Sequence, residues 1–171
     1  DVEFGELDRI LDESVPALHE LEQEGKIRSS GITGLPLRIF HRVLERQVPI
    51  DTALSYCHAT LFDDTLVPML PLFAKAGIGV INASPTAMGL LSSRGPRDWH
   101  PAGAPIKERC RLAAEDCRAR GVEIAELAIQ YACSHPGVAT TICGAATPDE
   151  IAQNVRAVQR KMDRALLTVV Q

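Results

Sequence analysis

The chain has 171 residues, of which 46% are hydrophobic and 23% charged, and its formal net charge is −4. This composition is typical of a globular domain that is large enough to bury a core of its own. The sequence has no basic block, which argues against a nucleic-acid partner, and no apolar run long enough to span a bilayer. We therefore expect a globular protein with no nucleic-acid partner and no membrane span.

The five cysteines are Cys57, Cys110, Cys117, Cys133 and Cys143. They form no CxxC pair and have no short regular spacing, a pattern typical of reduced thiols. We therefore expect the cytoplasm or another reducing intracellular compartment. Cys110 and Cys117 are predicted to share one face of a helix, and that stretch supplies too few ligands for a metal site.

The first segment has apolar residues at helical spacing, and Gly25 stands where such a helix would stop. Short apolar stretches then alternate with amphipathic ones. In chain order the sequence predicts a helix at residues 6–24, a strand at 27–33, a helix at 37–46, a strand at 51–56, a helix at 65–76, a strand at 79–83, helices at 106–120 and 124–134, a strand at 140–143 and a helix at 148–162. A loop rich in glycine and proline occupies residues 92–105.

Two helices carry specific start signals. Asp63 or Asp64 is the predicted N-cap of the helix at 65–76, and Pro71 indicates a late start or a kink. Thr147 is predicted to cap the last helix, with Pro148 and two acidic residues in its first turn. The last helix is expected to turn four apolar residues inward, namely Ile151, Val155, Val158 and Met162. The charged residues between 160 and 164 are expected to form a solvated face.

Strands that alternate with helices predict βαβ units and a parallel sheet. Four strands are half of an eight-stranded barrel, and no linker divides the chain. The predicted fold class is therefore α/β, with four parallel strands, helices outside, and residues 1–171 in one partial domain. The outer strands of a half barrel would expose unpaired backbone N–H and C=O groups. We therefore expect a missing half or another chain to cover them.

Small or polar residues end the predicted strands or directly follow them, among them Thr33, Tyr56, Ser84 and Gly144. A parallel α/β sheet places its chemistry at the carboxyl ends of its strands. The segments GITGLPL, ALSYCH, GVINASPTAMGLL, WHPA and GAATPDEIAQNV occur in this order. Over about residues 1–158 the chain thereby resembles the second half of the aldo-keto reductases, and within them the plant and algal L-galactose dehydrogenases.

This resemblance implies a (β/α)8 barrel that binds a nicotinamide dinucleotide in extended form across its carboxyl face. It also implies hydride transfer between a carbonyl and an alcohol, in this subgroup from the anomeric carbon of L-galactose to give the lactone. The family's catalytic Asp, Tyr, Lys and His are carried by earlier strands, with the His just before a segment like that at residues 1–5. We therefore expect Asp1 to be internal to a longer parent, no catalytic residue in this chain, and no hydride transfer by the chain alone.

The resemblance also implies cofactor-binding positions. Thr33 would hydrogen-bond the nicotinamide carboxamide, with Gly34 in place of the usual Asn; the alternative is an ordinary strand-to-helix turn. Tyr56 stands where the family has a carboxamide-binding Gln, and it could instead fill the barrel mouth. Ala83 replaces an aromatic ring that stacks on the nicotinamide in many members.

Further positions concern the phosphates and the adenine. Ser84 and Thr86, with the backbone of residues 87–89, are predicted to hold the pyrophosphate, and no GxGxxG loop supports a Rossmann fold. Gly144 and Ala145 precede the N-terminus of the last helix, a second place that suits a phosphate. The adenine would contact Gln153 and Asn154, which could equally form a polar helix face.

Cofactor preference is predicted from Ala146, because relatives that prefer NADP often carry an Arg there. Without that cation a 2′-phosphate loses its strongest partner, so NAD is expected over NADP. His58 and Trp99 are predicted to line the substrate pocket. His58 could instead be structural, and Trp99 could pin its loop to the barrel rim rather than act as a lid.

Three hypotheses follow. The first is an NAD(P)-dependent sugar oxidoreductase, of which this chain carries the cofactor-binding half. The second is a catalytically inactive structural subunit, derived from such an enzyme and held in a larger assembly by a partner that covers the open sheet edges. The third is a homodimer in which two copies contribute eight strands.

Overall fold

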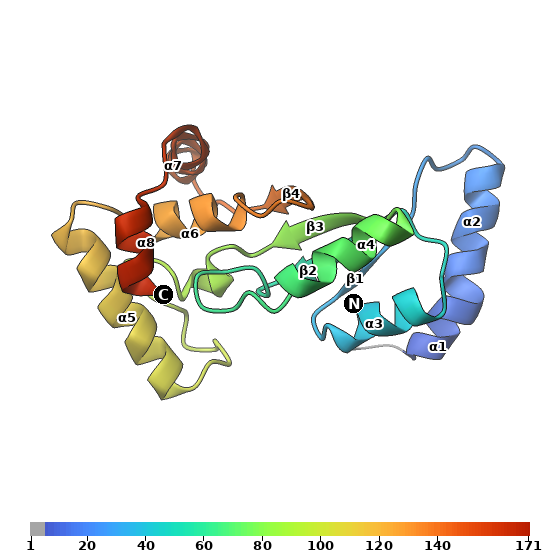
Figure 1. Ribbon diagram of the computed structural model, residues 1–171, viewed down its shortest axis with the longest axis horizontal. Coiled ribbons are helices and arrows are strands. Elements are labelled where there is room, and N and C mark those ends of the chain that lie inside the picture. The colour runs from blue at the N-terminus through green and yellow to red at the C-terminus, as the bar shows by residue number, and fades with distance from the viewer. Residues whose placement is uncertain (1–5) are drawn as a thin grey trace.

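A single parallel sheet organises the computed structural model, which describes residues 6–171 (Figure 1). Its strands lie in the order β1-β2-β3-β4 and all pairs are parallel. The strands are β1 (Gly31–Gly34), β2 (Thr52–Tyr56), β3 (Gly79–Ala83) and β4 (Val138–Ile142). The predicted α/β class with four parallel strands is confirmed. The segment at residues 1–5, from which the position of the family's His was inferred, lies outside the described residues.

The helices follow the predicted alternation. They are α1 (Leu7–Arg9), α2 (Val15–Gln23), α3 (Arg38–Glu45), α4 (Leu70–Ala76), α5 (Ala104–Ala119), α6 (Ile124–Ala132), α7 (Pro148–Gln159) and α8 (Arg164–Val170). A π-helical turn, Ile10–Ser14, joins α1 to α2. Pro16 lies in the first turn of α2 and has no N–H to donate to residue 12, which accounts for this local widening of the helix. Figure 1 shows α2 at one end of the molecule and α5, α7 and α8 at the other.

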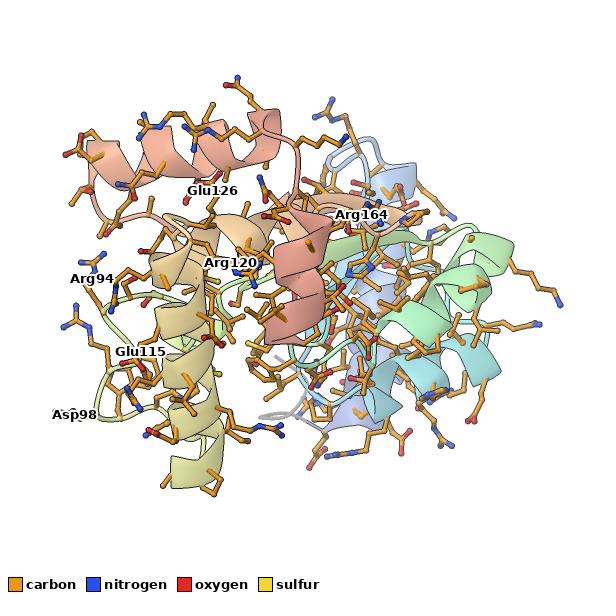
Figure 2. All side chains as sticks on the ribbon, turned by 60° about the vertical axis from the view of Figure 1, so that its left-hand side comes forward. Arg94, Asp98, Glu115, Arg120, Glu126 and Arg164 are labelled. Atoms are coloured by element: carbon orange, nitrogen blue, oxygen red, sulfur yellow. The ribbon has the colours of Figure 1, made fainter. Side chains whose placement is uncertain are left out.

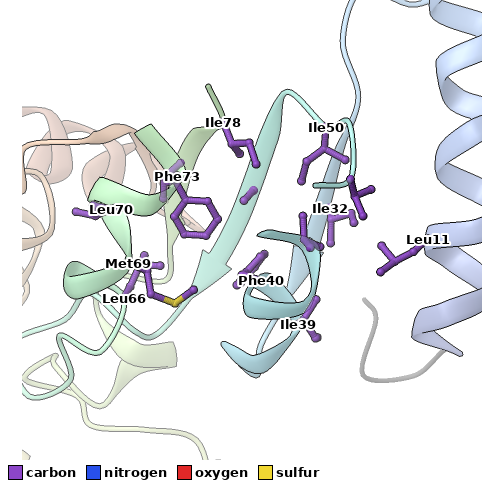
Figure 3. Close-up of a cluster of buried hydrophobic side chains, with 14 of the residues drawn as sticks. Leu11, Ile32, Ile39, Phe40, Ile50, Leu66, Met69, Leu70, Phe73 and Ile78 are labelled. Carbon is purple, nitrogen blue, oxygen red and sulfur yellow. The ribbon is translucent and has the colours of Figure 1, made fainter. Parts of the chain in front are cut away.

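One face of the sheet is packed against helices, and we call it the helix-packed face. Ile32, Ala53 and Val80 are neighbours in the strand register and are all buried. They share a core with Phe40 of α3 and Phe73 of α4, whose rings meet edge to face with centroids 5.7 Å apart (Figure 3). Successive side chains of a strand point to opposite faces of the sheet. The residues that follow these three along their strands therefore point away from the helices.

The other face, which we call the open face, is incompletely covered. Thr33, Leu54 and Ile81 are neighbours in the register, and Thr33 is exposed while the other two are half-buried. Ile142 at the end of β4 is 50% exposed. A closed barrel packs such residues in its interior. The sheet therefore has the arrangement of a partial barrel.

A second core lies around α5, α6 and α8. Cys110 and Cys117 are both buried there, as their predicted common helix face requires, and Leu166 of α8 is fully buried. The sequence did not predict α8. The charged residues between 160 and 164 are exposed, but Asp163 is also the N-cap of this helix, since its carboxylate accepts from the Leu166 N–H at 2.9 Å.

The predicted start of the helix at 65–76 is wrong. The α-helix begins at Leu70, after a 3₁₀ turn at Val67–Met69, which agrees with the late start indicated by Pro71. Asp63 caps no helix; its carboxylate accepts from the Thr65 N–H at 3.1 Å and closes a turn. A proline in the first turn needs no N–H partner, whereas an earlier start would have placed it inside the helix.

The helix predicted at 148–162, α7 in the structure, is capped as predicted, but its apolar side chains point to solvent rather than inward. Thr147 Oγ1 accepts from the Glu150 N–H at 3.2 Å, and the helix ends at Gln159 rather than at 162. The inward orientation predicted for Ile151, Val155 and Val158 is wrong, because these side chains are 57%, 49% and 53% exposed. Within the described residues α7 packs on α6 through Ala157, whose carbonyl accepts from Gln130 Nε2 at 3.0 Å.

The strand limits differ slightly from the prediction. β1 begins at Gly31 rather than at residue 27, and β4 covers Val138–Ile142 rather than 140–143. A side chain at position 31 would meet Thr52 Oγ1 at 2.1 Å, so only glycine allows the close approach of β1 to β2. Among residues 6–171, no helix has the length and apolarity that crossing a bilayer requires.

Candidate functional site

The turn after β3 contains the most strained backbone near the sheet. Ser84, Ala87 and Met88 have positive φ angles of 56°, 48° and 55°, and Gly89 follows at 96°. Positive φ is costly for residues with a Cβ, and such strain clusters at functional sites. The turn is closed by the Leu91 N–H, which donates to the Thr86 carbonyl at 3.1 Å.

A buried histidine holds this turn against the long loop that follows it. His100 Nδ1 accepts from the Ala102 N–H at 3.1 Å, so the ring proton belongs on Nε2. Nε2 lies 3.1 Å from the Ala87 carbonyl, to which it donates. His100 thus fixes the strained residue Ala87 to the β3–α5 loop.

A cavity of about 780 Å³ opens beside the turn, between the β3–α5 loop, the start of α6 and α7. Three residues predicted to bind a cofactor line it, namely Thr86, Gly144 and Gln153. Its charged lining residues are Arg94, Glu123, Glu126, Asp149, Glu150, Arg156 and Arg160. The volume lies within the range of small-molecule sites, and the mixture of charges suits a polar ligand.

An ion pair crosses the rim of the cavity. Arg94, from the β3–α5 loop, pairs with the carboxylate of Glu150 in the first turn of α7. The other oxygen of that carboxylate accepts from the Ala146 N–H at 2.7 Å. The Ala146 hydrogen bond, followed by Arg94, lowers the pKa of Glu150 below its ordinary value, so this carboxylate is ionised at neutral pH. Figure 2 shows Arg94 on its loop at the edge of the molecule.

A second pair lies further along α7. Arg160 Nη1 is 3.4 Å from the carboxylate of Glu126 on α6. Glu126 lies between α6 and α7 in Figure 2. The cavity therefore has a cation and an anion at each end, and a bound ligand would meet both kinds of charge.

Other predicted residues lie on the open face or in the turn. Thr33 and Tyr56 are in rows of β1 and β2 that point away from the helices, and neither lines the cavity. Ser84 leaves β3 with its N–H donating to the Ile142 carbonyl at 3.2 Å. Because the strands end side by side, these residues occupy the carboxyl edge of the sheet. Gly34 is buried on the helix-packed face, so of Thr33 and Gly34 only Thr33 lies on the open face.

The loop before α7 brings two further predicted residues together. Ala145 is exposed, and Asn154 Nδ2 donates to the Gly144 carbonyl at 3.5 Å. This contact closes the loop onto its helix. Asn154 does not line the cavity, whereas Gln153 beside it does.

The two predicted substrate residues lie apart from the cavity. His58 Nδ1 is 3.4 Å from Ser55 Oγ, and Ser55 is buried on the helix-packed face. Trp99 is 68% exposed, and its ring stacks on His100 with centroids 6.1 Å apart. His100, rather than Trp99, attaches the loop to the rest of the protein.

A cysteine lies close to the strained turn. Cys57 has a φ of 67°, and burial raises the pKa of its thiol despite a hydrogen bond with Ser84. A neutral thiol is a poor nucleophile. In the part of the chain that the structure describes, no group of three or more His, Cys, Asp or Glu side chains could hold a metal ion.

Sequence reasoning missed the roles of Arg94, His100 and Glu150. For Glu150 a signal was present, since Thr147-x-x-Glu150 matches the capping box, in which the acidic side chain turns back to the helix N-terminus. For Arg94 and His100 no local pattern exists, because their partners are distant in the sequence or depend on the loop conformation.

Comparison with known proteins gives a consistent result. The model of the Aldo/keto reductase family matches residues 3–168. L-galactose dehydrogenase from Arabidopsis thaliana is 44% identical over 177 aligned residues, which cover 100% of this chain and 56% of the relative. D-arabinose 1-dehydrogenase from Saccharomyces cerevisiae is 30% identical, over 88% of this chain and 48% of the relative. The chain thus spans about half the length of these curated relatives.

A solved structure shows the same relationship. The aldo-keto reductase AKR11C1 from Bacillus halodurans, in its holo form, is similar with a TM-score of 0.75 and 29% identity. The match covers 98% of this chain and 58% of the other. The sequence motifs, the parallel half barrel and these matches agree, and the chain belongs to the aldo/keto reductase family of oxidoreductases.

Proposed function

We propose that this chain is the cofactor-binding half of an NAD-dependent sugar dehydrogenase, and that the whole enzyme oxidises L-galactose at its anomeric carbon. Family membership implies a nicotinamide dinucleotide as the redox partner. The 44% identity to an L-galactose dehydrogenase along the entire chain supports the substrate class. A second similar protein, D-arabinose 1-dehydrogenase, is also named for a sugar.

The observation that carries this proposal is the strained turn beside the cavity. Residues 87–89 have consecutive positive φ angles, and Thr86 of this turn shares the cavity with Gly144 and Gln153. The Ala87 and Gly89 N–H groups donate within the turn, to the Ser84 carbonyl at 2.8 Å and to the Thr86 carbonyl at 3.1 Å. The side chain of Thr86 would therefore contact the pyrophosphate, and the cavity would hold the adenosine. Thr33 and Tyr56 on the carboxyl edge would hold the nicotinamide carboxamide. The small side chain of Ala83 leaves room beside Tyr56 on the same face.

In this proposal the residues of the chain bind and orient. Bound NAD would accept a hydride, and the anomeric hydroxyl of the sugar would give up its proton to a base as the lactone forms. The resemblance assigns that base and its partners to a segment other than this chain. Orientation alone does not remove a proton, so the 171-residue protein is expected to bind the cofactor without oxidising the sugar.

The preference for NAD rests on Ala146, which brings no cation to the loop before α7. A 2′-phosphate gains most from a charge-assisted contact with Arg or Lys. The ribose hydroxyls of NAD need no such partner.

Isothermal titration of the 171-residue protein with NAD⁺ tests the cofactor site, and absorbance at 340 nm after addition of L-galactose and NAD⁺ tests the chemistry. We expect saturable binding of NAD⁺ and no NADH. Failure to bind either NAD⁺ or NADP⁺ would contradict the cofactor assignment. NADH formed by this chain alone would contradict the assignment of proton transfer to another segment.

A structural subunit in a larger assembly is the second candidate, and it is favoured by the sheet edges. Each of β1 and β4 pairs with one strand among those described, and Ile142 is exposed on β4. Such edges are templates for a partner chain. Native mass spectrometry tests this: a complex with another protein supports it, a mass twice that of the chain supports the eight-stranded homodimer, and a stable monomer contradicts both.

We also propose that residues 1–171 form one partial domain and that the protein works in a reducing compartment such as the cytoplasm. The five cysteines are all free thiols, which supports the compartment. Labelling of all five by a thiol reagent after denaturation without reductant would agree with this, whereas a protected pair would contradict it.

A further inference from the structure

Glu150 occupies the position at which a ligand anion would meet the first turn of α7. Its carboxylate lines the cavity, accepts from the Ala146 N–H at 2.7 Å, and pairs with Arg94 across the rim. Its side chain is 24% exposed, against 79% for Arg94. The protein thus fills this position with a negative charge of its own.

A carboxylate held in this way still has acceptor capacity. Each of its oxygens carries two lone pairs, and one hydrogen bond to each is present. A pair of ribose hydroxyls could donate to the remaining lone pairs. A phosphate at the 2′ position would instead bring a second negative charge to the same place, and like charges at such short range repel. In other dinucleotide-binding folds an acidic residue selects the 2′-hydroxyl by this chemistry.

We propose that Glu150 is the residue that makes this site select NAD over NADP, by accepting hydrogen bonds from the adenosine ribose and repelling a 2′-phosphate. The inference rests on the proposed function, because it needs a dinucleotide in the cavity. It goes beyond the argument from Ala146, which identified only a missing cation. Arg94 would have the opposite effect, since it is a cation of the cavity lining and pairs directly with Glu150.

The competing explanation is that Glu150 only caps α7. A cap stabilises the helix whichever nucleotide is present, so its loss would weaken NAD⁺ and NADP⁺ binding by the same factor. A selecting residue changes the ratio of the two dissociation constants. The ratio therefore separates the two roles.

The experiment measures the Kd of NAD⁺ and NADP⁺ by titration calorimetry for the 171-residue protein and three variants. For Glu150→Gln we expect the preference for NAD⁺ to fall by about tenfold, the equivalent of one charge-assisted contact. For Arg94→Ala, an exposed position that threatens no core contact, we expect the preference to rise by about threefold. Asp98→Asn removes the same charge at an exposed residue of the β3–α5 loop that does not line the cavity, and we expect a change below about twofold because solvent screens that position.

Each outcome has a distinct meaning. If the wild-type protein binds neither nucleotide, the proposed function fails, and this inference with it. If it binds them but Glu150→Gln and Arg94→Ala leave the ratio unchanged, only the selecting role of Glu150 fails. An equal effect of Asp98→Asn and Glu150→Gln would also overturn it, since general charge would then be responsible.

Discussion

The two faces of the sheet are built from alternate residues of the same strands, yet they differ in completeness. On the helix-packed face, Ile32, Ala53 and Val80 are at most 5% exposed and meet two aromatic rings. On the open face, the intervening residues Thr33, Leu54 and Ile81 are exposed or half-buried. Of the two faces, the helix-packed one therefore contributes more to the stability of this chain.

The difference also separates stability from function. Thr33 and Tyr56, two of the residues proposed for cofactor binding, lie on the open face. Ile32, Ala53 and Val80 on the helix-packed face, by contrast, are apolar and have no polar group with which to bind a cofactor. Substitutions on the two faces should therefore change different measurements.

The largest effect is expected from Phe40→Ala. Phe40 is fully buried and packs edge to face on Phe73, so its truncation leaves a cavity and should lower the free energy of unfolding by about 3–5 kcal/mol. Urea unfolding followed by circular dichroism measures this. The matched control is Leu72→Ala on α4, whose side chain is 47% exposed and whose loss should cost below about 1 kcal/mol. Equal losses would mean that the helix-packed face is not the main core.

A finer comparison uses adjacent residues of β3. Val80 is 1% exposed on the helix-packed face, whereas its neighbour Ile81 is half-buried on the open face. We expect Val80→Ala to cost about 2 kcal/mol and Ile81→Ala less than about 1 kcal/mol, although the second removes more atoms. The same urea titration applies. A greater loss at Ile81 would show that the open face is packed in solution.

His100→Phe tests whether His100 holds the turn after β3 against the β3–α5 loop. Phenylalanine keeps the ring but leaves the Ala87 carbonyl and the Ala102 N–H without their partner. We expect a loss of about 1–2 kcal/mol and faster amide hydrogen exchange across residues 87–91, with exchange at Ile32 and Val80 unchanged. The exposed His41 provides a control, since His41→Phe should alter neither. Unchanged exchange at 87–91 would show that His100 does not hold the turn.

Much of this fold was predictable because it depends on local signals. Short apolar stretches located the strands, and the positive φ of Gly25 agrees with the helix stop read from the sequence. The early start predicted from Asp63 failed because aspartate also favours turns, and Pro71 decided the outcome. The orientation of α7 failed because periodicity identifies an apolar face but not whether a partner covers it.

The candidate site was predictable only in outline. The resemblance assigned Thr86, Gly144 and Gln153 to different parts of one cofactor, and the structure brings these three to one cavity. It could not place Glu150 against Arg94, because that contact joins residues 56 positions apart and depends on the path of the β3–α5 loop. Long-range side-chain pairs of this kind have no signature in a single sequence.

The smallest expected effect concerns pH and the second core. Burial, followed by the nearby Asp116 and Glu123, raises the pKa of the Cys117 thiol from 9.0 to about 11. Between these values the unfolded chain loses this proton and the folded chain keeps it, so the free energy of unfolding should fall as the pH rises through this range and be unaffected by this thiol below it. Urea titrations at pH 8, 9, 10 and 11 measure the slope, and Cys117→Ala should make it shallower. Cys133→Ala is the control because Cys133 is exposed, and its removal should leave the slope as in the wild type. An identical slope in all three proteins would mean that the thiol of Cys117 reaches water in the folded state, and the second core would then be looser than the helix-packed face.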